Sequence, residues 1–296
     1  MRRQPIARLT GAATVLLALG LWAAPGGARE GDHECHIFGL VCDDRAEYAA
    51  LFDSLCQGLY QKTVPAPPPR ETPTRDGWGF GYFLAPRDPS LVEPMRIRGG
   101  PPACEDSLRW GAAIREIETF ALGGATSVLG HVRKSSYGPD NGALPDPHPF
   151  ADSLRGRWWL FQHNGHMRPD SVRSWIPSDF LARHPIDYDE VYVDSEVFFR
   201  YCQYEIERLG TVEAGLRFAL HRVKIHNDFI FNICLTDGDT LWTAHTLSYT
   251  PFYFAATEDS SAWWASTVAI GTPHTAMARD HLYWFTPGAW GEASYE

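Results

Sequence analysis

The 296-residue sequence lacks the spacings that mark a metal protein. Structural zinc sites use cysteines and histidines at short, regular intervals. Here the six cysteines contain no C-x-x-C pair, and the twelve histidines are scattered along the chain. The sequence therefore carries no zinc signature, and we expect no cofactor.

Positive charge is scarce as well. The chain has 26 lysines and arginines against 36 acidic residues, for a net charge of −10, and losing the N-terminal segment would not reverse this sign. A negative surface is repelled by nucleic acids and by anionic membranes. We therefore expect neither a nucleic acid nor an anionic membrane as partner, while the sequence leaves the oligomeric state open.

Only one long hydrophobic run occurs, and it is short for a membrane span. Residues 1–8 carry arginines and no acid, and Leu9–Ala24 is apolar and small. A span needs roughly 20 apolar residues, whereas a basic stretch before a shorter apolar run is typical of a secretory signal. Cleavage after Ala28 would give a signal peptide over 1–28 and an exported protein, periplasmic or extracellular. An uncleaved N-terminal anchor is the alternative.

No methionine stands between Met1 and Met95, so translation cannot begin beside Cys35. Glu34 is also a poor residue for signal peptidase, which prefers small side chains. If Cys35 is to have a free amine, a second cleavage must remove residues 29–34, which we interpret as a short propeptide.

Cys35 begins a short apolar run, 35–41, that ends at polar residues and is typical of a buried strand. A cysteine in such a place is usually a small hydrophobic residue. With Cys35 set aside, five cysteines remain, so at most two disulfides could form, and their pairing cannot be read from sequence.

The remaining pattern mixes helices and strands, without an internal repeat or a linker between domains. Asp194 or Ser195 is expected to cap a helix, and Asn164-Gly165 alone is a common turn dipeptide. Alternating glycines and aromatics over 78–84 indicate a strand that another backbone approaches closely. We expect loops over 63–73 and 137–156, helices over 45–60, 105–122, 194–209 and 211–225, and strands over 78–84, 125–131, 157–166, 229–235, 241–246, 251–256, 262–266 and 282–286.

Seven short motifs occur in one order along residues 35 to about 290. They are Cys35-x-Ile37-Phe38-Gly39, Asp76-Gly77-Trp78-Gly79, His131-Val132-Arg133, His148-Pro149-Phe150, His163-Asn164-Gly165, Asp194-Ser195-Glu196 and Phe231-Asn232-Ile233-x-Leu235-x-Asp237-Gly238. In this order they resemble the class II glutamine amidotransferases, which are N-terminal-nucleophile (Ntn) hydrolases, and most closely the stand-alone members without a synthase domain. The resemblance implies an α+β fold, a four-layer αββα sandwich, over residues 35–296.

The resemblance also implies catalytic roles that make chemical sense. Cys35 would attack the side-chain amide of glutamine or of a γ-glutamyl compound, with its own α-amine as the base. The Asn164 amide and the Gly165 backbone N–H would form the oxyanion hole. Arg133 would bind the substrate α-carboxylate, and Asp194 its α-ammonium.

Two departures from the family pattern fall where substrate selectivity could be set. Lys134-Ser135-Ser136 stands where many members have Trp-Ala-Thr, so the Ser136 hydroxyl would replace that of threonine in substrate binding. Ser266-Thr267-Val268 stands in place of Ser-Glu-Pro.

The predicted function is that of an exported amidohydrolase that acts through an N-terminal cysteine thioester, and after processing we expect no contact with a membrane. Two alternatives stay open. One is a non-catalytic relative that binds an amino acid or a peptide end, and the other is a subunit that supplies ammonia to a separate synthase.

Overall fold

The computed structural model describes residues 35–43, 45–65, 73–84, 93–121, 127–134, 148–187, 193–226, 231–246, 250–271 and 273–296. The predicted signal peptide and propeptide lie outside the described residues, as do Ser136 and most of the loop predicted over 63–73. Within the described part of the chain, no helix is both long and apolar enough to cross a membrane.

One sheet, called sheet A here, has seven strands in the order β11-β9-β10-β1-β4-β2-β3, and all its pairs are antiparallel. The first strand lies near its centre, between β10 and β4, and is fully buried. The strands of sheet A are β1 (His36–Cys42), β2 (Trp78–Phe83), β3 (Met95–Gly99), β4 (Ser127–Val132), β9 (Tyr253–Ala256), β10 (Ala262–Ser266) and β11 (Thr275–Ala276).

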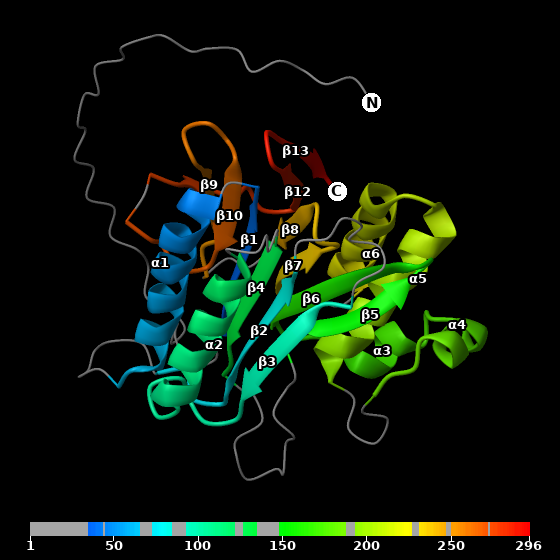
Figure 1. The fold of residues 1–296 in the computed structure, drawn as a ribbon. Coiled ribbons are helices and arrows are strands. Elements are labelled where there is room, and N and C mark those ends of the chain that lie inside the picture. Colours follow the sequence, from blue (N-terminus) through cyan, green and yellow to red (C-terminus); the bar gives the residue numbers. More distant parts are fainter. Residues whose placement is uncertain are drawn as a thin grey trace, which may run out of the picture. The chain divides into compact units, whose positions relative to one another are not determined.

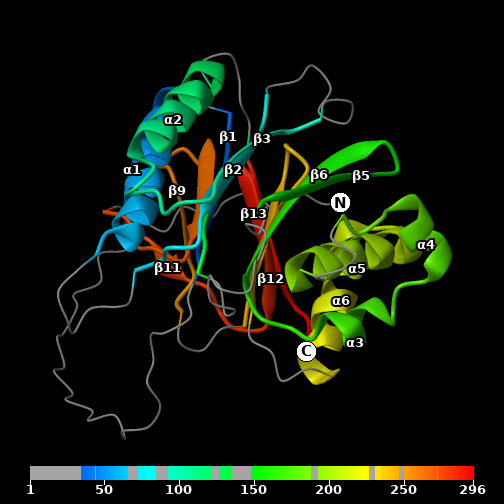
Figure 2. The same cartoon turned by 90° about the horizontal axis from the view of Figure 1, so that it is seen from below.

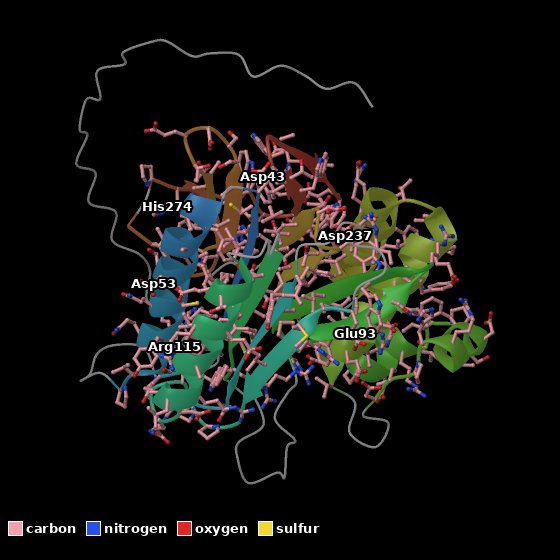
Figure 3. The ribbon with its side chains drawn as sticks, in the orientation of Figure 1. Asp43, Asp53, Glu93, Arg115, Asp237 and His274 are labelled. Atoms are coloured by element: carbon pink, nitrogen blue, oxygen red, sulfur yellow. The ribbon has the colours of Figure 1, made fainter. Side chains whose placement is uncertain are left out.

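The other sheet, sheet B, has six antiparallel strands in the order β13-β12-β8-β7-β6-β5. Asp237, labelled in Figure 3, lies between β7 and β8, where its carboxylate accepts hydrogen bonds from the backbone N–H groups of Asp239 and Thr240 at 3.2 and 2.9 Å. The strands of sheet B are β5 (Phe150–Leu154), β6 (Arg157–Gly165), β7 (Phe231–Thr236), β8 (Leu241–His245), β12 (His281–Thr286) and β13 (Ala289–Ser294).

Helices cover the outer face of each sheet (Figures 1 and 2). Helices α1 (Arg45–Thr63) and α2 (Ser107–Ala121) share an apolar core with β1, β2 and β4. Sheet B packs against the other four helices in a second core. These are α3 (Pro169–Arg173), α4 (Ser178–Arg183), α5 (Asp194–Leu209) and α6 (Val212–His226).

A third core lies between the two sheets, and it includes Ile37 and Val41 of sheet A and Leu160 and Leu241 of sheet B. One buried polar contact also crosses this space, because Nε2 of Gln162 donates to the carbonyl oxygen of Phe38 at 2.7 Å. The order helix, sheet, sheet, helix confirms the predicted αββα sandwich.

The strands that the sequence did not predict lie at the sheet edges. They are β3 and β11 in sheet A and β5 and β13 in sheet B. The prediction of a loop over 137–156 is wrong for residues 150–154, which form β5, and Arg155 and Gly156 turn the chain into β6 with positive φ angles of 54° and 77°. The short helices α3 and α4 were also not predicted.

One local prediction is wrong as well. Neither Asp194 nor Ser195 is the N-cap of α5, since that position is Val193 and has no side-chain cap. Asn164 and Gly165, a dipeptide common in tight turns, are here paired with Asn232 and Phe231 inside sheet B. The close backbone approach predicted at 78–84 is found at Gly79, where a Cβ atom would collide with the carbonyl oxygen of His148.

Candidate active site

Cys35 lies directly before β1, at the end of a strand that is held on both sides. Its half-buried thiol contacts the backbone of the residue that follows Arg133. The Lys134 N–H donates to Sγ at 3.3 Å, and Sγ donates to the Lys134 carbonyl oxygen at 3.4 Å. Since His36 is paired with Val132, continuing the register places Cys35 opposite Arg133. The predicted nucleophile and the predicted carboxylate-binding residue are therefore neighbours across two strands.

Thr267 holds the backbone of β1 at Ile37, which is two residues after Cys35. The Ile37 N–H donates to Oγ1 of Thr267 at 3.0 Å, and the Thr267 N–H donates to the Ile37 carbonyl oxygen at 3.0 Å. Thr267 is buried. It is the middle residue of Ser266-Thr267-Val268, so this departure from the family pattern supports the strand that carries Cys35.

Arg133 is positioned by the Asp76-Gly77 segment. Its N–H donates to the Gly77 carbonyl oxygen at 2.9 Å, and its carbonyl oxygen accepts from the Asp76 N–H at 3.0 Å. Gly77 has a φ angle of 109°, and a Cβ atom there would lie 2.8 Å from the Gly99 carbonyl oxygen. This turn therefore requires glycine, which explains the Asp76-Gly77 motif as a support for the site.

Asn164 and Gly165 are the last residues of β6. The same strand contacts β1 through the hydrogen bond from Gln162 to Phe38. Asn164 is 3% exposed, and among the described residues no acceptor lies within hydrogen-bond distance of its Nδ2. Buried amide donors without a partner are rare in native proteins. Gly165 is exposed, with a φ angle of 146° that favours glycine. This strand end therefore offers an amide donor and an accessible backbone position, as an oxyanion hole requires.

Asp194 is tied to the same end of β6. One carboxylate oxygen, Oδ2, accepts from the Met167 N–H at 2.9 Å and lies 3.5 Å from Nδ1 of His166. The next residue, Ser195, is within 2.9 Å of Nδ1 of His163. Burial alone would raise the pKa of Asp194, but His166, His163 and the Met167 N–H together lower it. Asp194 is therefore a stable carboxylate at neutral pH.

Buried imidazoles stand next to Cys35 and Arg133 in the chain, because His36 follows Cys35 and His131 comes two residues before Arg133. His131 stacks on His148 with ring centroids 4.3 Å apart, and burial, reinforced by the nearby His148 and Arg133, lowers the pKa of His131 well below its usual value. Burial, with Lys62 and Lys134 nearby, lowers the pKa of His36 to about 3. These two rings are therefore neutral at pH 7.

The other cysteines differ from Cys35 in their surroundings. Burial raises the pKa of Cys56, Cys202 and Cys234, which makes their thiols poor nucleophiles. No disulfide joins any of the six, all of which belong to the described residues. The described residues also contain no group of three or more His, Cys, Asp or Glu arranged to hold a metal ion.

Asn232 and His245 are polar residues to which the sequence interpretation gave no role. Asn232 is paired with Asn164 in sheet B, and its Oδ1 lies 2.7 Å from Nδ1 of His245. Asn232 stands within a quoted motif, but the contact with His245 depends on strand pairing, and no sequence signal could have found it. Ser136, the remaining predicted site residue, lies outside the described residues.

Comparison with known proteins gives the class of this fold and site. The class-II glutamine amidotransferase family matches residues 35–259. No curated protein matches the sequence. Since the family match spans most of the chain, the protein belongs to the class II glutamine amidotransferases.

Two solved structures share its fold. Glutamine phosphoribosylpyrophosphate amidotransferase from B. subtilis, complexed with ADP and GMP, is similar with a TM-score of 0.58 and 12% identity, over 88% of this chain and 49% of that one. A glutamine aminotransferase class-II domain protein from Silicibacter pomeroyi is similar with a TM-score of 0.50 and 19% identity, over 75% of this chain and 92% of that one. The chain thus spans about half the length of the first protein. At these identities the likeness establishes the Ntn-type fold.

Proposed function

We propose that the chain, once trimmed so that Cys35 is its first residue, hydrolyses the side-chain amide of glutamine or of a γ-glutamyl compound outside the cytoplasm. The export rests on the composition of residues 1–28. The chemistry rests on the family and on the arrangement around Cys35.

In the first half of the reaction the Cys35 thiol gives its proton to its own α-amine, and Sγ bonds to the amide carbon. The negative charge that develops on the carbonyl oxygen is stabilised by Nδ2 of Asn164 and the N–H of Gly165. Losing one such donor costs on the order of 3 kcal/mol of barrier in hydrolases. The carbon–nitrogen bond then breaks, and the protonated α-amine gives its proton to the leaving amine.

In the second half, water attacks the thioester and passes a proton to the α-amine. The carbon–sulfur bond breaks, the thiol is restored, and glutamate leaves as the acid product. An N-terminal amine suits both steps, because its pKa near 8 lets it accept and return a proton at neutral pH.

The amino-acid end of the substrate would be recognised by one cation and one anion. Arg133 is fixed through its backbone beside Cys35, and a guanidinium can bind a carboxylate with two parallel hydrogen bonds. Asp194 remains charged at neutral pH because of its contacts with His166 and Met167. The two residues would thus hold the zwitterion while its amide meets the thiol.

The single observation that carries the proposal is the buried Asn164 amide. Its Nδ2 has no acceptor among the described residues, although burying such a donor costs about 1–3 kcal/mol when it stays unpaired. A substrate oxygen would satisfy it. Without a ligand, the unpaired Asn164 donor would only destabilise the fold.

The test uses protein produced with Cys35 as its first residue and a diazoketone analogue of glutamine. We expect one covalent addition at Cys35, together with hydrolysis of glutamine or of a γ-glutamyl peptide. Cys104, which is also only partly buried, serves as the internal control and should stay unlabelled. A trimmed protein that is neither labelled at Cys35 nor active on any of these amides would exclude the proposed function. The N-terminal residue of protein from its native host, read by Edman sequencing, tests the trimming itself.

A further inference from the structure

Three polar residues form a row across neighbouring strands of sheet B. Asn164 of β6 is paired with Asn232 of β7, which is paired with His245 of β8. This row lies on the face of the sheet that carries Leu160 and Leu241, and those residues pack between the two sheets. Cys35 continues the face of β1 that carries Ile37, which packs in the same space. The polar row and the thiol therefore belong to the same interior of the sandwich.

The side chain of Asn232 is fully buried, and only one end of its amide has a hydrogen-bond partner. Its Oδ1 is bonded to His245, whereas no atom of the described residues accepts a hydrogen bond from its Nδ2. Asn164 has the same unsatisfied Nδ2 on the adjacent strand. Directly opposite residues have Cβ atoms about 5 Å apart, so two such amides can reach one oxygen atom.

His245 fixes the direction of the Asn232 amide. Burial, with Arg279 nearby, lowers the pKa of His245 to about 4, so at pH 7 the ring is neutral and carries one N–H. That hydrogen lies on Nδ1, because the Asn232 oxygen can only accept. The His245 carbonyl oxygen in turn accepts from the Asp280 N–H at 2.8 Å and from the Tyr295 hydroxyl at 3.4 Å. The amide is thereby held with its oxygen occupied and its Nδ2 available.

We propose that Asn232 is a substrate-binding residue, whose Nδ2 donates to the side-chain carboxamide oxygen of the substrate beside Nδ2 of Asn164. His245 is its positioning residue. The inference rests on the proposed function and extends it, because it gives the acyl oxygen a second side-chain donor. It also predicts a ligand class, namely compounds whose side chain ends in a carbonyl or carboxylate oxygen.

The experiment compares two ligands that differ only at the proposed contact. Glutamine has the side-chain carboxamide, and norvaline keeps the same carbon chain and amino-acid end without it. Their dissociation constants are measured by calorimetry on Cys35→Ala protein that begins at residue 35, so that no turnover occurs. Adding Asn232→Ala should weaken glutamine binding about 10-fold and leave norvaline binding unchanged. Asn232→Asp, which keeps the shape but replaces the donor with an acceptor, should weaken glutamine binding at least as much.

Cys234→Ala is the matched control. Cys234 is fully buried and lies on the same strand and the same face as Asn232, but it is paired with Gln162 and not with Asn164. This variant should bind both ligands like its parent, and circular dichroism should show all variants folded. Equal weakening of glutamine and norvaline, or weakening of neither, would overturn the inference while leaving the proposed function standing. A trimmed parent that neither hydrolyses nor binds glutamine would instead overturn the proposed function, and this inference with it.

Discussion

At the scale of single residues, the pair of His166 and Asp194 should make the proposed binding of the substrate α-ammonium depend on pH. The hydrogen bond to Asp194 raises the pKa of His166, which is 46% exposed, and the same pair lowers that of Asp194. The stabilising effect of the pair is therefore present between these two pKa values, and it is lost as the pH rises through the raised pKa of His166.

The consequence for binding has the opposite sign. In the proposed complex, protonated His166 would compete with the substrate α-ammonium for the Asp194 carboxylate, so glutamine should bind trimmed Cys35→Ala protein more tightly as the pH rises from about 6 to about 8. Calorimetry across this pH range measures the effect. The His166→Asn variant should bind glutamine with a nearly constant affinity. If its affinity still changed with pH as in the parent, His166 would not be the group responsible.

How far the site could be predicted depends on the kind of contact. Cys35, Asn164 and Arg133 stand in short motifs, so the sequence could name them as candidate site residues. The role that we propose for Asn232 could not be predicted, because its Nδ2 is left unsatisfied only through burial and through strand pairing. Asp194 was expected in the site, but its partners His166 and Met167 come from the segment between β6 and α3.

At the scale of elements, β1, the strand that follows Cys35, depends on Thr267. Thr267→Val keeps the volume but removes the oxygen that accepts from the Ile37 N–H, which then stays buried without a partner. The cost should be about 1–3 kcal/mol of unfolding free energy. Urea denaturation measures this loss, and the alkylation rate of Cys35 should change with it.

Thr267→Ser is the matched control, since it retains the hydroxyl and loses one methyl group. It should keep most of the stability and the parent alkylation rate. If the serine and valine variants behave alike, packing rather than the hydrogen bond is what Thr267 supplies.

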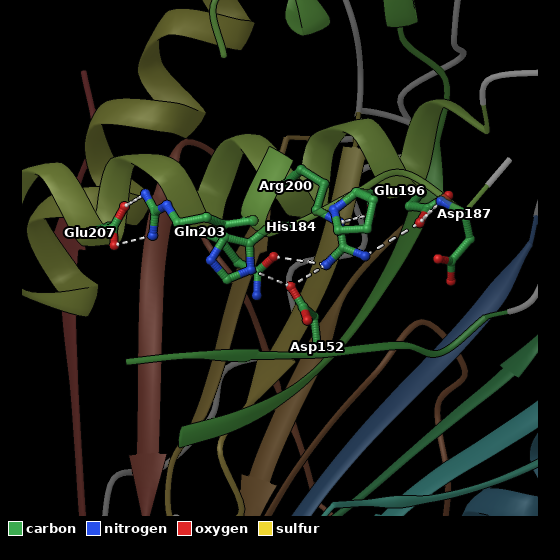
Figure 4. A network of polar contacts seen from close by, with 9 residues as sticks. Asp152, His184, Asp187, Glu196, Arg200, Gln203 and Glu207 are labelled. Carbon is green, nitrogen blue, oxygen red and sulfur yellow. Dashed lines mark hydrogen bonds and ion pairs between the residues drawn. The ribbon is translucent and has the colours of Figure 1, made fainter. Parts of the chain in front are cut away.

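A second element-scale device holds α5 against β5 and the segment before the helix (Figure 4). Arg200 is 4% exposed and bonds Asp152 at 2.5 Å, the Pro185 carbonyl oxygen at 3.0 Å and Gln203 at 3.1 Å. Glu196, two residues after Asp194, lies 3.5 Å from the same guanidinium. The network thus steadies the start of the helix that carries Asp194.

Breaking this network should be costly because buried Glu196 and half-buried Asp152 would both lose a neighbouring cation. Arg200→Met should lower the unfolding free energy by about 3–5 kcal/mol, measured by urea denaturation. Arg183→Met removes the ion pair with Glu207 in the same region, but that arginine is 51% exposed, so little change is expected. Equal losses in both variants would show that burial does not decide the cost.

At the scale of the whole molecule, the central strands of the two sheets could be predicted from the sequence better than the edge strands. The central strands are apolar runs, and β1 and β10 were found close to their observed bounds. The four missed strands are the four sheet edges, and β5 reads Phe-Ala-Asp-Ser-Leu while β13 is largely exposed. An edge strand pairs on one side only and needs less apolar surface, so its sequence resembles a loop.

The pairing of β1 with β10 links the two ends of the fold. Cys35 stands at the start of β1, and the register joins Phe38 to Ser266, while Thr267 closes the clamp on Ile37. None of these contacts can form until more than two hundred further residues have been synthesised, and contacts so distant along the chain form slowly. During synthesis on the ribosome, the strand that follows Cys35 must therefore wait until Thr267 has been added before it can pair with β10. The proposed reactive centre is encoded early in the described chain and assembled late, so a nascent chain that stops before Thr267 would have no ordered site at which the Cys35 thiol could act.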